Sequence, residues 1–169
     1  CWIRPNFGGR GRKLPGNLEA HANGFRYSTQ KAEQVDIMYS NIKHAIFQPC
    51  EKDLITLIHF HLHNPIMIGK KKITDVQFYT EVVEGTVALD GGRRSMYDPD
   101  EIDEERKDRE RKNRINNGYR AFVKKIQEMW EQKHAQLQLE WDVPFRELGF
   151  EGVPHKSTST VLPCLNCLV

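Results

Sequence analysis

The sequence contains no long hydrophobic run and carries little net charge. Its longest apolar stretch, Leu54–Leu62, is far shorter than the ~20 residues of a membrane-spanning helix, so we expect a soluble protein. The 25 basic and 23 acidic residues leave a formal net charge of +2. So small a charge argues against attraction of the whole surface to nucleic acid or anionic membrane, and it directs the search for charged partners to local patches.

Cysteine is also scarce, with four residues in 169. Only Cys164 and Cys167 have the spacing of a metal-binding pair, and a structural zinc ion needs about four ligands, so this Cys-x-x-Cys alone is weak evidence for a metal site. We predict free thiols in a reducing compartment. The sequence begins at Cys1 without an initiator methionine and stops at Val169 in an apolar segment, so we expect a piece of a longer protein.

Motifs of the common enzyme classes are absent as well. The chain has no Gly-x-Ser-x-Gly, no glycine-rich phosphate loop ending in Lys-Ser/Thr, and no helical His-Glu-x-x-His. These absences predict a protein that is not an enzyme and uses no cofactor.

Up to residue 84 the chain is a series of short segments with the alternation typical of β-strands. Asn23-Gly24 predicts a tight hairpin, because both residues tolerate positive φ. Asn64-Pro65 is an expected strand end, since proline cannot donate to a ladder, and Lys70–Lys72 is expected to lie in a loop. About seven strands are expected, over residues 2–5, 18–22, 25–27, 35–39, 42–46, 54–63 and 75–82.

After residue 97 the period changes to that of a helix. Asp98 supplies an N-cap and Pro99 the first helical position, and carboxylates follow where the helix dipole favours negative charge. We expect the helix to extend to about Trp130. Its first half is almost wholly charged, so only the second half has a face to bury. That face consists of Ile115, Tyr119, Phe122, Ile126 and Met129. The tail at 157–162 is expected to have no partner within the chain.

The apolar stretch from Leu54 ends in alternating histidines and admits two interpretations. As a strand, it turns one set of side chains into the core (Ile58, Phe60, Leu62) and the other set outward (His59, His61, His63). As a metal site, the histidines would converge on an ion, yet no acidic residue follows at an obvious fourth-ligand position. We favour the strand, and we predict no metal site.

Three charged clusters are candidate binding sites. Two basic loops could hold phosphates of lipid head groups or of a nucleic-acid backbone; they contain Arg10, Arg12 and Lys13, and Lys70, Lys71 and Lys72. An acidic run at the helix start could engage a basic partner; it contains Asp98, Asp100, Glu101, Asp103, Glu104 and Glu105. The alternative for the loops is plain solvation, and for the acidic run it is a favourable helix start.

Several longer segments resemble a known family. They are Leu18–Arg26, Asn41–Ala45, Phe47–Pro49, His59–Asn64, Asp75–Val82 and Arg146–Pro154. Together they resemble the middle domain of the large subunit of FACT, the histone chaperone that disassembles and rebuilds nucleosomes. The likeness covers nearly the whole chain, and motifs of this length are specific.

The layout of the elements and the resemblance imply one fold class, mainly β with a C-terminal α-helix. It is a pleckstrin-homology-like seven-stranded barrel capped by one long helix and followed by the start of a second such module. The expected boundaries are 1–134 for the first domain, with strands over about 2–84 and the helix over about 98–130, and 135–169 for a linker and the truncated second domain.

The resemblance also implies a function without catalysis. The module would bind core histones in the nucleus during transcription elongation, DNA replication and DNA repair, beside an HMG-box small subunit. The acidic run would face histones, the basic loops would make an indirect contact with nucleosomal DNA, and no membrane would take part. An alternative of another class is a phosphoinositide-binding adaptor domain that uses Arg10, Arg12 and Lys13.

Overall fold

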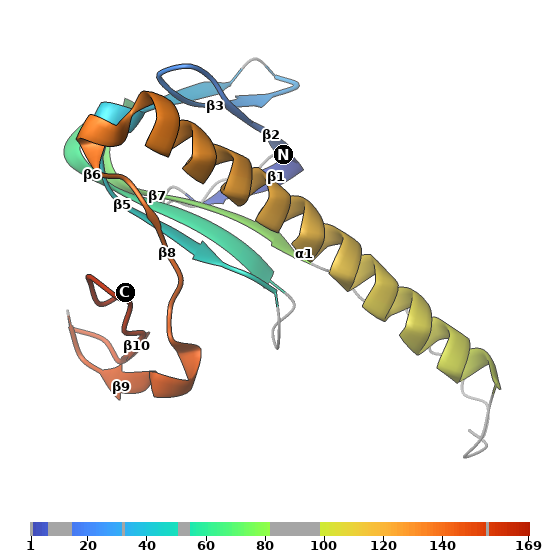
Figure 1. Ribbon diagram of the computed structural model, residues 1–169. Coiled ribbons are helices and arrows are strands. Elements are labelled where there is room, and N and C mark those ends of the chain that lie inside the picture. The colour runs from blue at the N-terminus through green and yellow to red at the C-terminus, as the bar shows by residue number, and fades with distance from the viewer. Residues whose placement is uncertain (1, 7–14, 32, 51–54, 82–98, 155) are drawn as a thin grey trace.

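A computed structural model describes residues 2–6, 15–31, 33–50, 55–81, 99–154 and 156–169. In these residues the chain is mainly β with one long helix, as expected (Figure 1). The seven predicted strands are all present before the helix. They are β1 (Trp2–Asn6), β2 (Gly16–Ala20), β3 (Gly24–Thr29), β4 (Gln34–Met38), β5 (Ile42–Gln48), β6 (Ile55–Ile68) and β7 (Lys71–Glu81).

These strands form an open sheet rather than the closed barrel that we expected. Its order is β4-β3-β2-β1-β7-β6-β5, and a short strand β8 (Trp141–Asp142) adds to β5 in parallel. Within the described residues no ladder joins β4 to β5. A 3-10 turn, η1 (Tyr39–Asn41), connects them instead. The ring of Tyr39 lies 5.7 Å from that of Trp130 on the helix, so side-chain packing rather than backbone pairing spans this corner.

The register of β6 is the predicted one. Ile58 and Phe60 are fully buried and Leu62 is 2% exposed, whereas His63 is exposed and His59 and His61 are half-buried on the opposite face. On the neighbouring strand β7, Val76 and Phe78 are also fully buried. The period of two therefore identifies the core face of β6 correctly, and β7 shows the same alternation.

The hairpin at Asn23-Gly24 is confirmed, but its geometry is not the expected one. Ala20 pairs with Phe25, and the His21 N–H donates to the Gly24 carbonyl at 2.8 Å. Neither Asn23 nor Gly24 has a positive φ. Glycine is needed at position 24 for space, because a Cβ there would lie 2.4 Å from the carbonyl oxygen of Ile37 on β4.

The prediction that β6 stops at Asn64-Pro65 is wrong. The strand continues to Ile68, with an irregularity in its pairing between His61 and Ile66. Pro65 falls inside this irregularity, where its missing N–H removes no ladder hydrogen bond. The turn that follows is correspondingly short. Lys70 lies in it, while Lys71 and Lys72 belong to β7 instead of the predicted loop.

The helix α1 (Pro99–Lys133) begins at the predicted proline and packs only its second half into the core. Tyr119, Ile126 and Trp130 are at most 5% exposed. Four further apolar residues of this helix pack against the same core: Ile115, Phe122, Val123 and Met129. Trp130 stacks on Trp141 with ring centroids 5.2 Å apart, and Phe25 of β3 lies 6.2 Å from Trp130. Aromatic pairs of this kind stabilise by about 1 kcal/mol each beyond their buried area.

A buried polar clamp fixes where the helix meets the sheet. The side-chain amide of Asn116 accepts from the Cys50 N–H at 2.8 Å and donates to the Cys50 carbonyl, and Thr56 donates to the same amide oxygen at 3.5 Å. Asn116 and Thr56 are both buried. The periodicity of apolar residues did not predict this contact, because Asn116 is polar.

The C-terminal segment does have partners, contrary to our expectation for residues 157–162. β10 (Ser159–Val161) pairs with β9 (Phe150–Gly152), and Leu162 and Val169 exchange backbone hydrogen bonds. Asp142 of β8 accepts from the backbone N–H groups of Leu165 and Asn166 at 3.1 and 3.2 Å. The tail is therefore tied to the sheet through β8, by pairings too short to give a period in the sequence.

None of the helices that the structure describes is long and apolar enough to cross a membrane.

Replacing Asn116 with Ala should destabilise the fold by about 3 kcal/mol, because the N–H and C=O of Cys50 would both lose their hydrogen bond with Asn116. Urea denaturation measures the change. The matched control is Asn117→Ala on the exposed face of the same turn, which should stay within about 0.5 kcal/mol of the parent. Equal effects at the two positions would contradict the role of the clamp.

Replacing Gly118 with Ala should stabilise the fold. Gly118 lies inside α1, and a Cβ at this position meets no atom within 4 Å. Alanine removes the entropic cost of a helical glycine, so the free energy of unfolding should rise by about 1 kcal/mol. A lower urea midpoint for this variant would show that the space is not free.

Candidate functional site

The histidine row is a set of cross-strand pairs on the outer face of the sheet. His61 faces Asp75 of β7, with 2.6 Å between Nδ1 and a carboxylate oxygen, and His59 Nε2 lies 3.4 Å from the same oxygen. His59 also contacts Gln77 at 3.3 Å. The acidic partner of the histidines is thus Asp75 on the neighbouring strand β7, and the sequence of β6 alone could not reveal it.

This face is electrostatically coupled. Burial alone would raise the pKa of Asp75, but hydrogen bonds from His61 and Thr74 outweigh it and hold this pKa below its ordinary value. His44 of β5 stacks on His61 with ring centroids 6.1 Å apart. Burial, helped by the charges of Lys43 and His61, lowers the pKa of His44. His59 and His61 thus find polar partners in Asp75 and Gln77 of β7, as is common for cross-strand neighbours in a sheet.

A different group brings ligand atoms together. Among the described residues, only Asp142, Cys164 and Cys167 place three such atoms within 4.8 Å of one another. Burial raises the pKa of Cys164 to about 12 and also raises that of Cys167. An ion would therefore have to displace both thiol protons and would find three ligands, one fewer than a structural zinc site uses. Cys50, Cys164 and Cys167 are all free thiols.

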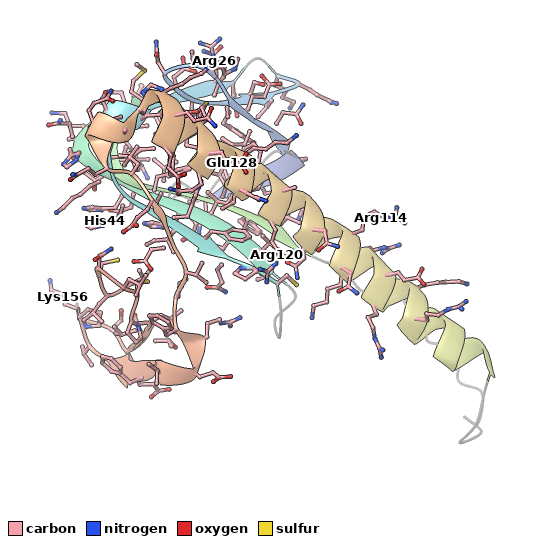
Figure 2. All side chains as sticks on the ribbon, in the orientation of Figure 1. Arg26, His44, Arg114, Arg120, Glu128 and Lys156 are labelled. Atoms are coloured by element: carbon pink, nitrogen blue, oxygen red, sulfur yellow. The ribbon has the colours of Figure 1, made fainter. Side chains whose placement is uncertain are left out.

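A groove of about 630 Å³ lies between α1, the edge of β5 and β8. Five apolar residues line it: Phe47, Pro49, Val123, Trp141 and Val143. The charged lining is sorted by sign along α1, with Arg120 and Lys124 first and Glu128 and Glu131 after them, and Glu140 lies across from the helix. Arg120 and Glu128 both project from the helix surface (Figure 2). We call this site the acidic-rimmed groove.

The carboxylates of the acidic-rimmed groove are held by neutral or weakly paired neighbours. Gln127 donates to Glu131 at 2.9 Å, and Asn166 donates to Glu140 at 3.0 Å. Glu128 lies 3.9 Å from Lys124, both being well exposed. An exposed pair of this kind stabilises little, so all three carboxylates remain available to a cationic ligand.

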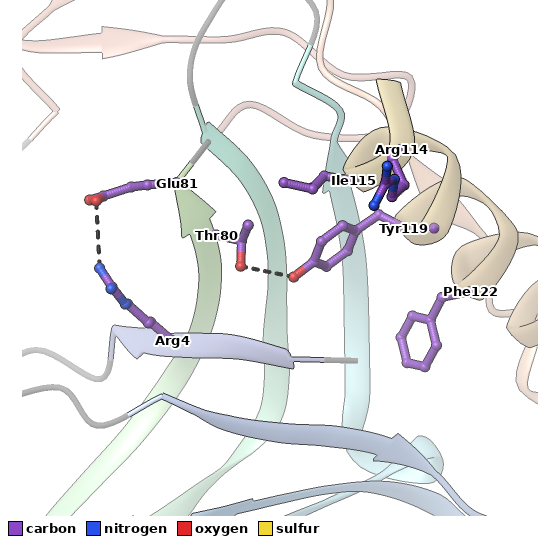
Figure 3. Close-up of a pocket in the computed structure, with 8 residues that line it drawn as sticks. Arg4, Thr80, Glu81, Arg114, Ile115, Tyr119 and Phe122 are labelled. Carbon is purple, nitrogen blue, oxygen red and sulfur yellow. Dashed lines mark hydrogen bonds and ion pairs between the residues drawn. The ribbon is translucent and has the colours of Figure 1, made fainter. Parts of the chain in front are cut away.

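A second pocket, also about 630 Å³, opens between β1, β7 and α1 (Figure 3). Arg4 and Glu81 form an ion pair of 3.5 Å at its edge, and Tyr119 donates to Thr80 at 3.0 Å. Burial raises the pKa of Tyr119, so its hydroxyl stays protonated and cannot act as a base. The pocket has the size of a small-molecule site but presents no pairing of nucleophile and base.

Of the predicted charged clusters, only the lysines at the β6–β7 turn have described side chains. Lys70, Lys71 and Lys72 are exposed at the β6–β7 turn, at the end of the sheet away from the start of α1 (Figure 1). Asp100, Glu101, Asp103, Glu104 and Glu105 lie in the first turns of α1, where the backbone alone is described, and Asp98, Arg10, Arg12 and Lys13 lie outside the described residues. Inspection of these clusters missed the acidic-rimmed groove, because its lining comes from three separate segments.

Comparison with known proteins adds independent information. Residues 1–126 match the family described as FACT complex subunit SPT16 PH-like domain. Over 170 residues the chain is 61% identical to the FACT complex subunit SPT16 of Zea mays and to that of Oryza sativa subsp. japonica, and over 167 residues it is 46% identical to FACT complex subunit spt-16 of Caenorhabditis elegans. Each alignment covers 99% of this chain, which spans about 16% of the length of the plant relatives and 15% of the nematode one.

The lowered pKa of His44 gives a prediction for stability against pH. Because the imidazole binds a proton less readily in the folded state, acidification below its ordinary pKa of 6.5 favours unfolding. The parent should lose stability between about pH 7.5 and 5.5, and His44→Gln should lose less over the same range. The difference between the two in unfolding constant should be smaller than tenfold per pH unit, which is the change that uptake of one full proton would give. Urea midpoints across this range measure it.

The matched control is His63→Gln, which removes an exposed imidazole from the same face of the sheet. It should leave most of the pH dependence in place. If the two variants behave alike, burial of His44 is not the cause.

Proposed function

Because the chain belongs to the family of the FACT complex subunit SPT16 PH-like domain, we propose that it is a histone-binding module of the FACT histone chaperone. This is not an enzyme family, and a chaperone needs surfaces rather than reacting groups. Within the whole protein, the module would act in the nucleus during nucleosome disassembly and reassembly in transcription, replication and repair. Core histones and the HMG-box small subunit of FACT are the proposed partners.

The acidic-rimmed groove is the observation that best supports histone binding. Histones are basic proteins whose segments interleave lysine and arginine with small apolar residues. An apolar floor that includes Phe47, Val123 and Trp141 can bury the apolar side chains, and the carboxylates of Glu128, Glu131 and Glu140 can pair with the cations. The shape and local negative charge of the groove can thus attract a basic histone, although the chain as a whole has a net charge of +2.

The mechanism that we propose is competitive shielding. A rigid sheet and helix hold the groove in place, so the groove loses little conformational freedom when a histone segment binds. The bound segment cannot contact DNA while the complex lasts. The acidic run at 98–105 would provide a second, weaker contact, because it gathers six carboxylates in eight residues at one end of the same helix.

We also propose that residues 135–169 begin a second pleckstrin-homology-like module, while 1–134 form the first. Large apolar side chains of this segment are exposed, among them Leu148 at 64%, Phe150 at 52% and Leu165 at 72%. Apolar surface of this extent is more typical of a segment that packs against further structure than of a finished surface.

Neutralising the groove with Glu128→Gln, Glu131→Gln and Glu140→Gln should weaken binding of histones about tenfold at low salt. The reason is the loss of three contacts of about 0.5 kcal/mol each. Pull-down and titration against separated core-histone dimers and tetramers across a salt series provide the measurement. The salt dependence of the parent should also be steeper than that of the variant.

The control removes three carboxylates elsewhere, with Glu19→Gln, Glu33→Gln and Glu151→Gln, and should bind histones like the parent. A further variant replaces residues Asp100, Glu101, Asp103, Glu104 and Glu105 with Ser or Ala. If only this variant loses affinity, the acidic run and not the groove is the histone site. Binding to phosphoinositide vesicles without any binding to histones would support the adaptor alternative instead.

A further inference from the structure

Residues 162–169 fold into a small hairpin that carries both cysteines of the Cys-x-x-Cys motif. Leu162 and Val169 exchange backbone hydrogen bonds of 2.7 and 2.9 Å, and the Cys164 N–H donates to the Cys167 carbonyl at 2.8 Å. The two cysteines therefore flank a two-residue turn, where paired side chains lie on the same side of the hairpin. Their thiols also hydrogen-bond to each other. The motif is thus folded as a pair of adjacent sulfur atoms.

A carboxylate from β8 lies against this turn. Asp142 accepts from the N–H of Leu165 at 3.1 Å through one oxygen and from that of Asn166 at 3.2 Å through the other. Asp142 is only 6% exposed. The side-chain amide of Asn166 also donates to Glu140 at 3.0 Å, so two acidic residues hold the turn in place. The sequence could not pair Asp142 with the cysteines, because the contact forms only when the hairpin folds back on β8.

The carboxylate and the two thiols have the spacing of metal ligands. One ligand atom from each of Asp142, Cys164 and Cys167 lies within 4.8 Å of the other two. In a tetrahedral zinc site, with Zn–S of about 2.3 Å and Zn–O of about 2.1 Å, neighbouring ligand atoms are roughly 3.6 to 3.8 Å apart. Shifts of roughly 1 Å would therefore bring all three atoms onto one ion. Both cysteines are half-buried, so an ion can reach them from the solvent.

The electrostatics of this cluster favour a dication. Apart from burial, the described neighbours that shift the pKa of the two thiols are each other and Asp142, and no cation is among them. Burial and the negative charge of Asp142 raise the pKa of both thiols, which keeps the protons in place while no ion is bound. A bound dication reverses this balance, since a coordinated thiol is deprotonated outright.

The donor atoms select the class of ion. Thiolate sulfur is a soft ligand that favours Zn²⁺, whereas Mg²⁺ and Ca²⁺ prefer sites made wholly of oxygen. Three protein ligands with one position left to water is an arrangement that zinc commonly adopts in proteins. We propose that Asp142, Cys164 and Cys167 bind a zinc ion, with water in the fourth position.

This proposal revises the expectation of no metal site that the sequence suggested. The motif alone supplied two ligands, and the structure adds a third from a separate strand. A bound ion would join the hairpin to β8 through bonds that the unfolded chain cannot form in the same geometry, so it would stabilise the folded tail. None of the three ligands lines the acidic-rimmed groove, so the proposal goes beyond histone binding and does not depend on it.

The test titrates Co²⁺ and then Zn²⁺ into the 169-residue chain, kept reduced with a phosphine near neutral pH. Co²⁺ should give thiolate-to-cobalt charge-transfer absorption in the near ultraviolet that saturates at a single ion per chain, and Zn²⁺ should abolish it. Cys164→Ser and Cys167→Ser should each weaken Zn²⁺ binding at least about 100-fold, because loss of a group that only orients a ligand already costs about 10- to 100-fold. Competition with a chromophoric chelator measures these affinities.

Asp142→Asn keeps an oxygen that can accept from the turn but loses the negative charge. This variant should bind Zn²⁺ at least about tenfold more weakly and should keep the charge-transfer absorption, since both thiols remain. Zn²⁺ should also raise the Tm of the parent and leave that of the double variant, Cys164→Ser with Cys167→Ser, unchanged.

The matched control removes the two other thiols of the chain, with Cys1→Ser and Cys50→Ala, and should bind Zn²⁺ within about threefold of the parent. A second control, His59→Gln with His61→Gln, removes the imidazoles of the histidine row. Circular dichroism confirms that each variant keeps the fold. The proposal is overturned if the parent shows no charge-transfer absorption, if the cysteine variants keep the affinity of the parent, or if either control loses as much affinity as they do.

Discussion

The packing of the second half of α1 onto an open sheet is the contact on which the rest of the molecule depends. The ladder leaves the corner between β4 and β5 unpaired, and Trp130 fills it against Tyr39 and Phe25. Without the helix, the inner face of the sheet would be exposed, and an antiparallel sheet with one wet and one apolar face is not stable alone. The Asn116 clamp then fixes the position of the helix along its axis, because its partner is the backbone of Cys50 at the end of β5.

The same packing creates the acidic-rimmed groove, to which we assign a partner. Where α1 passes the edge of β5, the linker that follows the helix returns beside it, and Trp141 stacks on Trp130 to close the far wall of the acidic-rimmed groove. Where α1 passes the edge of the sheet, it has nothing left to pack on, and its side chains are charged. One helix therefore has a buried half that builds a cleft and a projecting half whose sequence is rich in charges of both signs.

On the outer face of the sheet, polar residues link neighbouring strands. His59, His61 and Asp75 meet across two strands, so one carboxylate is a partner for two imidazoles. Asp142 serves a similar purpose at the sheet edge, since its carboxylate accepts two backbone N–H groups and holds the tail in place. Asp75 and Asp142 thus act as links between segments.

The sequence by itself determined the strands, the helix and the faces that they bury, because alternation and helical periodicity are local properties of neighbouring residues. Ile58, Phe60 and Leu62 were assigned inward and the histidines outward, and the predicted helical face of Tyr119 and Ile126 enters the core. Only the tertiary structure decided that the sheet stays open, that Pro65 does not end β6, that Asp75 joins the histidines and that the tail pairs. It also decided the acidic-rimmed groove, which forms from Phe47, Glu128 and Glu140. These features bring together residues far apart in the chain, and no period in the sequence records which distant segments will meet.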